Sequence, residues 1–118
     1  MRVCGHLYGV IAAKNVSIRD LTLDHKTNKT IDNGIAILPS GSNFDGIPSE
    51  NVVVERVSVL GTPTPHSYLI WNFRGRGVKI MSNYVDGGVS AYDNKSNQEG
   101  IESYGGKDVL LFGNTVRN

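Results

Sequence analysis

Four segments of the chain align with one another, and this repetition constrains the fold more than any other feature. The alignment superposes four valines, each preceded by Asn, Gly or Asp, which are turn-forming residues. The segments are Asn15-VSIRDLTLDH, Asn51-VVVERVSVLG, Gly77-VKIMSNYVDG and Asp108-VLLFGNTVRN. The aligned residues Val16, Val52, Val78 and Val109 are separated by 36, 26 and 31 residues. Self-similarity at periods of roughly 20 to 50 residues is typical of folds built from stacked repeats.

Each segment has the apolar period of a strand. Side chains two apart in sequence share one face of a β-strand, whereas a helix repeats every 3.6 residues. Each valine has an apolar partner two residues later, and we expect both columns to stack in the core. These partners are Ile18, Val54, Ile80 and Leu111. At the bend that follows, Asn83 and Asn114 are expected to adopt left-handed backbone geometry.

A second set of short apolar strands lies upstream of the first set. These strands contain Gly9-Val-Ile-Ala, Gly34-Ile-Ala-Ile, Tyr68-Leu-Ile-Trp and Gly100-Ile-Glu-Ser. The last two repeats register without a gap, because Ile70 and Ile101 each precede their aligned valine by eight residues. The pattern predicts one all-β domain over residues 1–118, a right-handed parallel β-helix of about four coils. An antiparallel sandwich is the alternative, since it also has short strands with Gly and Asn turns.

Both ends of the predicted stack lack a polar cap. Open ends expose unpaired backbone groups and apolar side chains, so the chain is expected to be a fragment or to associate with another copy, end to end or side by side. The formal charge of +1, without a run of Lys or Arg, favours neither nucleic acid nor an anionic membrane as partner. His6 and two glycines interrupt the apolar run near the N-terminus, so no signal peptide is recognised.

The run Gln98-EGIESYGGKDVLLFGNTVRN, echoed by Asn15-VSIRDLTL and Asn51-VVVERVSV, resembles the β-helix repeat of the pectate-lyase-like superfamily. That family includes pectin and alginate lyases, polygalacturonases, mannuronan epimerases and phage tailspike glycosidases. The resemblance implies an elongated carbohydrate groove along one outer sheet, with a polysaccharide as partner. It also implies a secreted, extracellular or virion-surface location.

The register of the last two repeats places several chemically capable residues on one outer face. Trp71 and Glu102 are expected to lie side by side, as are Phe73 and Tyr104, with Lys107 extending the surface. Aromatic rings stack on the apolar faces of sugars and carboxylates accept hydroxyl hydrogen bonds, so we assign Trp71, Phe73, Tyr104 and Lys107 to substrate binding.

A glycosidase needs two carboxylates about 5 to 9.5 Å apart. The candidates for such a pair are Glu102, Glu99, Asp93 and Asp86. Two functions therefore stay open: a polysaccharide hydrolase or lyase, and a non-catalytic carbohydrate- or receptor-binding segment of a tailspike, adhesin or stalk. No cofactor is predicted. Asp93, Asn94, Asn97 and Glu99 offer oxygen ligands suited to calcium, but no calcium-loop signature accompanies them.

Overall fold

The computed structural model describes residues 6–24, 33–61, 67–87 and 98–117, and every regular element within these ranges is a β-strand. The strands form two sheets in which all pairings are parallel. The all-β prediction is confirmed. The described part of the chain offers no helix that could cross a membrane.

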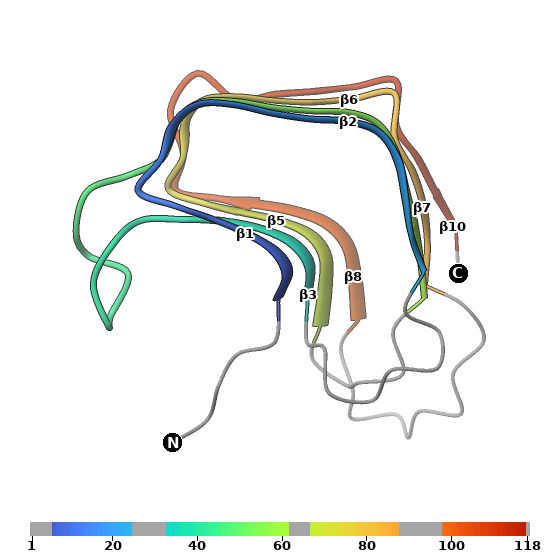
Figure 1. Ribbon diagram of the computed structural model, residues 1–118, viewed down its shortest axis with the longest axis horizontal. Coiled ribbons are helices and arrows are strands. Elements are labelled where there is room, and N and C mark those ends of the chain that lie inside the picture. Colours follow the sequence, from blue (N-terminus) through green and yellow to red (C-terminus); the bar gives the residue numbers. More distant parts are fainter. Residues whose placement is uncertain (1–5, 25–32, 62–66, 88–97, 118) are drawn as a thin grey trace.

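The chain alternates between two sheets. Sheet A has the order β1 (His6–Ile11), β3 (Asn33–Leu38), β5 (Ser67–Phe73) and β8 (Gln98–Tyr104). Sheet B contains β2 (Lys14–Asp24), β4 (Glu50–Leu60), β6 (Arg76–Met81), β7 (Tyr84–Asp86), β9 (Leu110–Phe112) and β10 (Thr115–Arg117). Four layers result: layer 1 is β1 and β2, layer 2 is β3 and β4, layer 3 is β5 to β7, and layer 4 is β8 to β10. The layers follow nearly the same path in Figure 1.

The register between layers in sheet B is the one that the repeat predicts. Val52 pairs with Val16 on one side and with Val78 on the other. Layer 4 continues this register, because Leu110 pairs with Lys79 and so places the fourth valine beside the third. The predicted alignment of the four segments is therefore confirmed residue by residue.

The core lies between the two sheets and is filled by branched aliphatic side chains of the middle layers. Val52, Val54, Val78 and Ile80 have no exposed surface, because each has a neighbour in the layer above and in the layer below. The column that contains Ile80 ends in layer 4 at Leu111, whose side chain is 47% exposed. Leu111 was expected in the core, but only one layer covers it.

Left-handed backbone geometry recurs at the corner before each aligned valine. Asn15, Asn51, Gly77 and Asp108 have φ angles of 59°, 53°, 60° and 53°. Glycine has no Cβ to clash in this conformation, and Asn and Asp tolerate it better than other residues. The sequence places tolerant residues at all four positions, so the predicted turn role is confirmed.

The second bend differs from the prediction. Positive φ angles occur not at Asn83 and Asn114 but one residue earlier, at Ser82 (55°) and Gly113 (65°). The asparagines instead turn their side chains inward, and Asn83 is only 2% exposed. The left-handed residue makes the bend, and the asparagine supplies the hydrogen bonds that the bent backbone loses.

Asn83 joins two layers through its side-chain amide. Its Oδ1 accepts the N–H of Val57 at 2.9 Å, and its Nδ2 donates to the carbonyl of Val54 at 3.0 Å. Asn114 repeats this one layer on: its Oδ1 accepts the N–H of Asn83 at 3.0 Å and its Nδ2 donates to the carbonyl of Ile80 at 2.8 Å. Buried polar groups are tolerated when they are paired in this way.

The shape of the molecule does not support the recognition of a pectate-lyase-like β-helix. The molecule is compact, with extents of 36 × 35 × 22 Å. The shortest axis, along which Figure 1 is viewed, runs through the layers, because parallel strands are only about 4.8 Å apart.

An ion pair joins the first two layers on the outer side of sheet B. Arg56 Nη2 donates to Asp20 Oδ2 at 2.9 Å, and Arg56 Nε donates to Oδ1 of the same carboxylate. This hydrogen bonding lowers the pKa of Asp20 below its ordinary value, and Asp20 raises the pKa of Arg56 in turn. Both groups are exposed, so the pair fixes local register rather than global stability.

We predict that Val78→Asp prevents folding. The change places an unpaired charge among side chains with no exposed surface, which costs several kcal/mol at least. Lys79→Asp is the matched control, because Lys79 is the next residue of β6 and its side chain is exposed. Circular dichroism and thermal unfolding measure both variants. Equal stability of the two would contradict the assignment of Val78 to the core.

We also predict that Arg56→Gln raises the pKa of Asp20, because the main cause of its lowering is the hydrogen bond from Arg56. A carboxylate whose pKa is lower in the folded state stabilises the fold above its unfolded pKa, and this contribution is lost as pH falls through the folded-state pKa. The stability difference between wild type and variant should thus be largest near neutral pH, begin to shrink as the pH falls to about 4, and vanish only below the folded-state pKa of Asp20. NMR titration of the Asp20 carboxyl carbon gives the pKa. An unchanged midpoint would show that the hydrogen bond from Arg56 does not cause the lowering.

Candidate functional site

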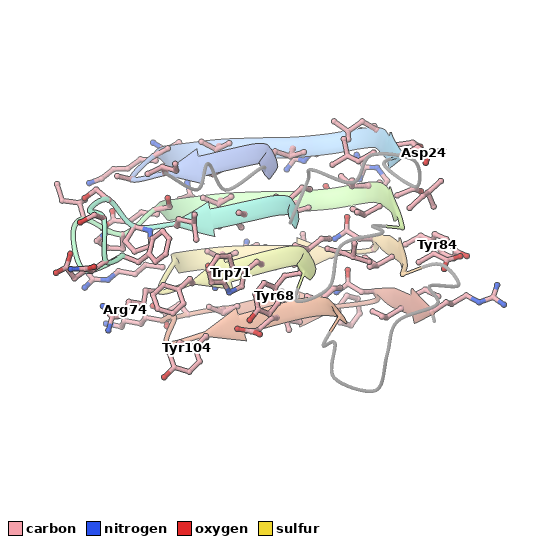
Figure 2. The ribbon with its side chains drawn as sticks, turned by 90° about the horizontal axis from the view of Figure 1, so that it is seen from below. Asp24, Tyr68, Trp71, Arg74, Tyr84 and Tyr104 are labelled. Carbon is pink, nitrogen blue, oxygen red and sulfur yellow. The ribbon has the colours of Figure 1, made fainter. Side chains whose placement is uncertain are left out.

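The outward face of sheet A carries the predicted pairs in the predicted register. Trp71 pairs with Glu102 and Phe73 pairs with Tyr104 across β5 and β8, while Ala36 lies beside Trp71 in β3. Strand alternation turns these side chains away from the core, because the intervening residues of β5 are fully buried. Figure 2 shows Trp71, Tyr68 and Tyr104 on this face.

Five rings form one aromatic cluster on this face: Phe44, Tyr68, Trp71, Phe73 and Tyr104. Tyr68 and Trp71 stack with ring centroids 5.0 Å apart, and Phe73 and Tyr104 stack nearly parallel at 5.4 Å. Phe44 meets both Trp71 and Phe73 edge-on at 6.0 Å. Each such contact contributes roughly 0.5 to 1.5 kcal/mol beyond burial. The cluster is therefore a rigid surface rather than a set of separate side chains.

Phe44 comes from the segment 39–49 between β3 and β4, and sequence reasoning missed it. The segment folds back on itself: Ser40 Oγ accepts the N–H of Ile47 at 2.7 Å, and the carbonyl of Ser40 accepts the N–H of Gly46 at 2.9 Å. These bonds hold the aromatic ring over β5. A single aromatic residue inside a Gly- and Pro-bounded insertion was the signal available in the sequence.

The cluster leaves one ring open. Trp71 is partly buried between Phe44 and Tyr68, and its indole Nε1 is buried with no acceptor among the residues that the structure describes. Tyr104 is 60% exposed and stacks on Phe73, whereas the other four rings of the cluster are only partly exposed. Tyr104, not Trp71, is therefore the ring of the cluster with the most surface accessible to a ligand.

Arg74 borders the cluster at the corner after β5. Its guanidinium carbon lies 5.4 Å from the centroid of Phe73, and its Nη1 donates to the carbonyl of Phe44 at 3.3 Å. The corner is held by buried Asn72, whose Oδ1 accepts the N–H of Gly75 at 3.2 Å and whose Nδ2 donates to Ser103 Oγ at 2.9 Å. The asparagine thus sets the direction in which Arg74 leaves the sheet.

Of the four predicted catalytic acids, the two whose side chains the structure describes, Glu102 and Asp86, lie on different sheets. Glu102 lies on β8 beside Trp71, and no other acidic side chain on sheet A is within the described part of the chain. Asp86 lies on β7 in sheet B, where it pairs with Arg117 in the register and accepts a hydrogen bond from Tyr84 Oη at 3.4 Å. Asp93 and the side chain of Glu99 lie outside the described residues.

Lys107 is displaced from the aromatic face. It forms a parallel bridge with Arg76 at the corner that leads into sheet B. The possible calcium ligands Asp93, Asn94 and Asn97 lie outside the described residues, as does the side chain of Glu99. Among the side chains that are described, no group of three or more His, Cys, Asp or Glu is placed to hold a metal ion.

Comparison with known proteins gives the chain no relatives: no protein-family model, no curated protein and no solved structure matches it. The expected membership of the pectate-lyase-like superfamily is therefore wrong. The matching residues were the Asn-Val and Gly-Asn turns and the alternating aliphatic residues. These follow from parallel strand stacking in general and do not identify one family.

Proposed function

We propose that the chain binds carbohydrate on the outward face of sheet A and does not itself cleave it. The observation that carries this proposal is the aromatic cluster with the open ring of Tyr104. Flat, rigid aromatic surface suits the apolar face of a pyranose ring, and it loses little conformational entropy on binding. The partly exposed carboxylate of Glu102 and the guanidinium of Arg74 flank the rings, where they can hydrogen-bond sugar hydroxyls.

The described acids support one of the two functions left open by the sequence. Glycoside hydrolysis requires an acid and a second carboxylate at a defined separation. On sheet A, Glu102 has no such companion among the described side chains, and Asp86 belongs to the other sheet. A non-catalytic binding role is therefore favoured, and a hydrolase or lyase is the alternative. The extracellular location and the association of copies stay predictions.

For the fold, we propose the finer description that the four layers are coils of a right-handed parallel β-helix outside the pectate-lyase-like superfamily. Support comes from the parallel pairing of each layer with the next in both sheets. Crossover connections between parallel strands are right-handed in nearly all proteins, which favours that hand here.

We predict that Tyr104→Ala weakens binding of a recognised oligosaccharide about 5- to 150-fold, through the loss of about 1 to 3 kcal/mol of apolar contact. Phe112→Ala is the matched control, because Phe112 is an aromatic residue of the same layer, 66% exposed, on sheet B. A glycan array selects the ligand and calorimetry measures the affinity. Equal losses in both variants would rule out the face of sheet A.

We predict that Glu102→Gln leaves affinity nearly unchanged and that neither protein releases products from the polysaccharide it binds. The amide keeps the shape and hydrogen-bonding capacity of the carboxylate but cannot act as a general acid or nucleophile. Chromatography of reducing ends after long incubation measures cleavage. Turnover by the wild type that disappears in the variant, with binding retained, would establish the enzyme alternative instead.

A further inference from the structure

A cationic cavity adjoins the aromatic cluster at the corner between the two sheets. It has a volume of about 280 Å³ and is lined by Arg74, Arg76 and Lys107, together with Pro39, Pro48 and two glycines. Among the residues that the structure describes, no acidic residue lines it. A cavity of this size is slightly below the range typical for whole small-molecule ligands, so it suits a substituent or a single small group.

Main-chain bonds hold two of the cations next to each other. Arg76 and Lys107 form a parallel bridge, in which the carbonyl of Lys107 accepts the N–H of Gly77 at 2.9 Å and its N–H donates to Gly75 at 3.1 Å. The N–H of Arg76 is anchored to the carbonyl of Ser49 at 2.9 Å. The side chains therefore start from backbones about 4.8 Å apart and cannot separate by moving a loop.

Like charges directly opposite on neighbouring strands are destabilising. The column that contains them is Lys14, Glu50, Arg76 and Lys107, and its one carboxylate forms an ion pair with Lys14 at 3.2 Å. In the described part of the chain no ion pair engages Arg76 or Lys107. Glu50 adjoins Arg76 in the register, but one carboxylate offsets only one of the three cations in the column.

Arg74 connects the cavity to the aromatic cluster. It uses Nη1 for the carbonyl of Phe44 and lies over the ring of Phe73, so other guanidinium donors remain for a ligand. Gly105, which lines the cavity, has a φ of 64°, and a Cβ there would stand 3.3 Å from Cγ of Arg74. Glycine at this position keeps the space that the arginine stem occupies.

We propose that this cavity binds an oxyanion group, a carboxylate or a sulfate ester, carried by the sugar chain that stacks on Tyr104. Two guanidinium groups supply planar paired donors that match such oxygens, and Lys107 adds a third charge. Binding of the anion also relieves the repulsion between Arg76 and Lys107. The substrate class rests on the proposed carbohydrate function, whereas the oxyanion site itself does not.

The site is tested first without any glycan. Sodium sulfate and sodium acetate are titrated separately into the isotopically labelled protein, with sodium chloride holding ionic strength constant. Saturable NMR shifts of the Gly105 and Gly46 amides, which line the cavity, are expected with at least one of the two anions. In the double variant Arg76→Gln/Lys107→Gln, the apparent affinity for the anion that these shifts report should fall at least tenfold. Linear, unsaturable shifts in the wild type would overturn the proposal.

Lys79→Gln is the matched control. Lys79 is an exposed cation on β6, three residues after Arg76, and it does not line the cavity. It should retain the anion-induced shifts. If this variant loses them as fully as the double variant, the effect is one of general charge and the cavity is not the site.

The glycan arm separates the two proposals. Neutral, uronic and sulfated oligosaccharides of equal length are compared by calorimetry. An acidic ligand should bind at least tenfold more tightly than the neutral one, and the double variant should remove this preference while neutral binding persists. Anion shifts without any glycan binding would leave the oxyanion site standing and refute the carbohydrate function. Glycan binding without a charge preference would refute the acidic substrate class.

Discussion

Parallel, in-register pairing between layers is the constraint on which the other features depend. Each residue of a middle layer lies between its equivalents in the layers above and below, as Val52 lies between Val16 and Val78. The residues of one column are therefore constrained together, because each contacts its equivalents in the neighbouring layers. Aliphatic residues make a core in this arrangement, asparagines make a chain of hydrogen bonds, and aromatic rings make a stack.

The sequence was informative where a column has the same chemistry in every layer. The four valines and the turn residues before them could be aligned by eye, and so could the pairs Trp71 with Glu102 and Phe73 with Tyr104. The sequence pattern could not identify a protein family, because these regularities arise in any stack of parallel strands and carry no information about common descent.

Other features escaped sequence reasoning for physical reasons. Phe44 reaches the cluster through a folded-back segment of layer 2, and no period within the strands encodes that contact. Leu111 has the period of a core residue, but the period records which face a side chain occupies and not how many layers cover it. Asn83 is of a residue type common in turns, yet the neighbouring Ser82 adopts the left-handed geometry. The side-chain amide of Asn83 therefore makes its hydrogen bonds inside the core.

The same stacking explains why charge collects at one corner. A carboxylate and an arginine that are equivalent in neighbouring layers form an ion pair, as Asp20 and Arg56 do. Where two cations are equivalent, as Arg76 and Lys107 are, the backbone pairing that holds the fold also keeps the two residues on neighbouring layers. Their backbones cannot separate locally, because the hydrogen bonds at Gly75 and Gly77 belong to the stack itself. A negatively charged ligand at this corner would offset the excess of cations without disturbing the layers, and the aromatic cluster beside it would supply apolar surface to orient such a ligand.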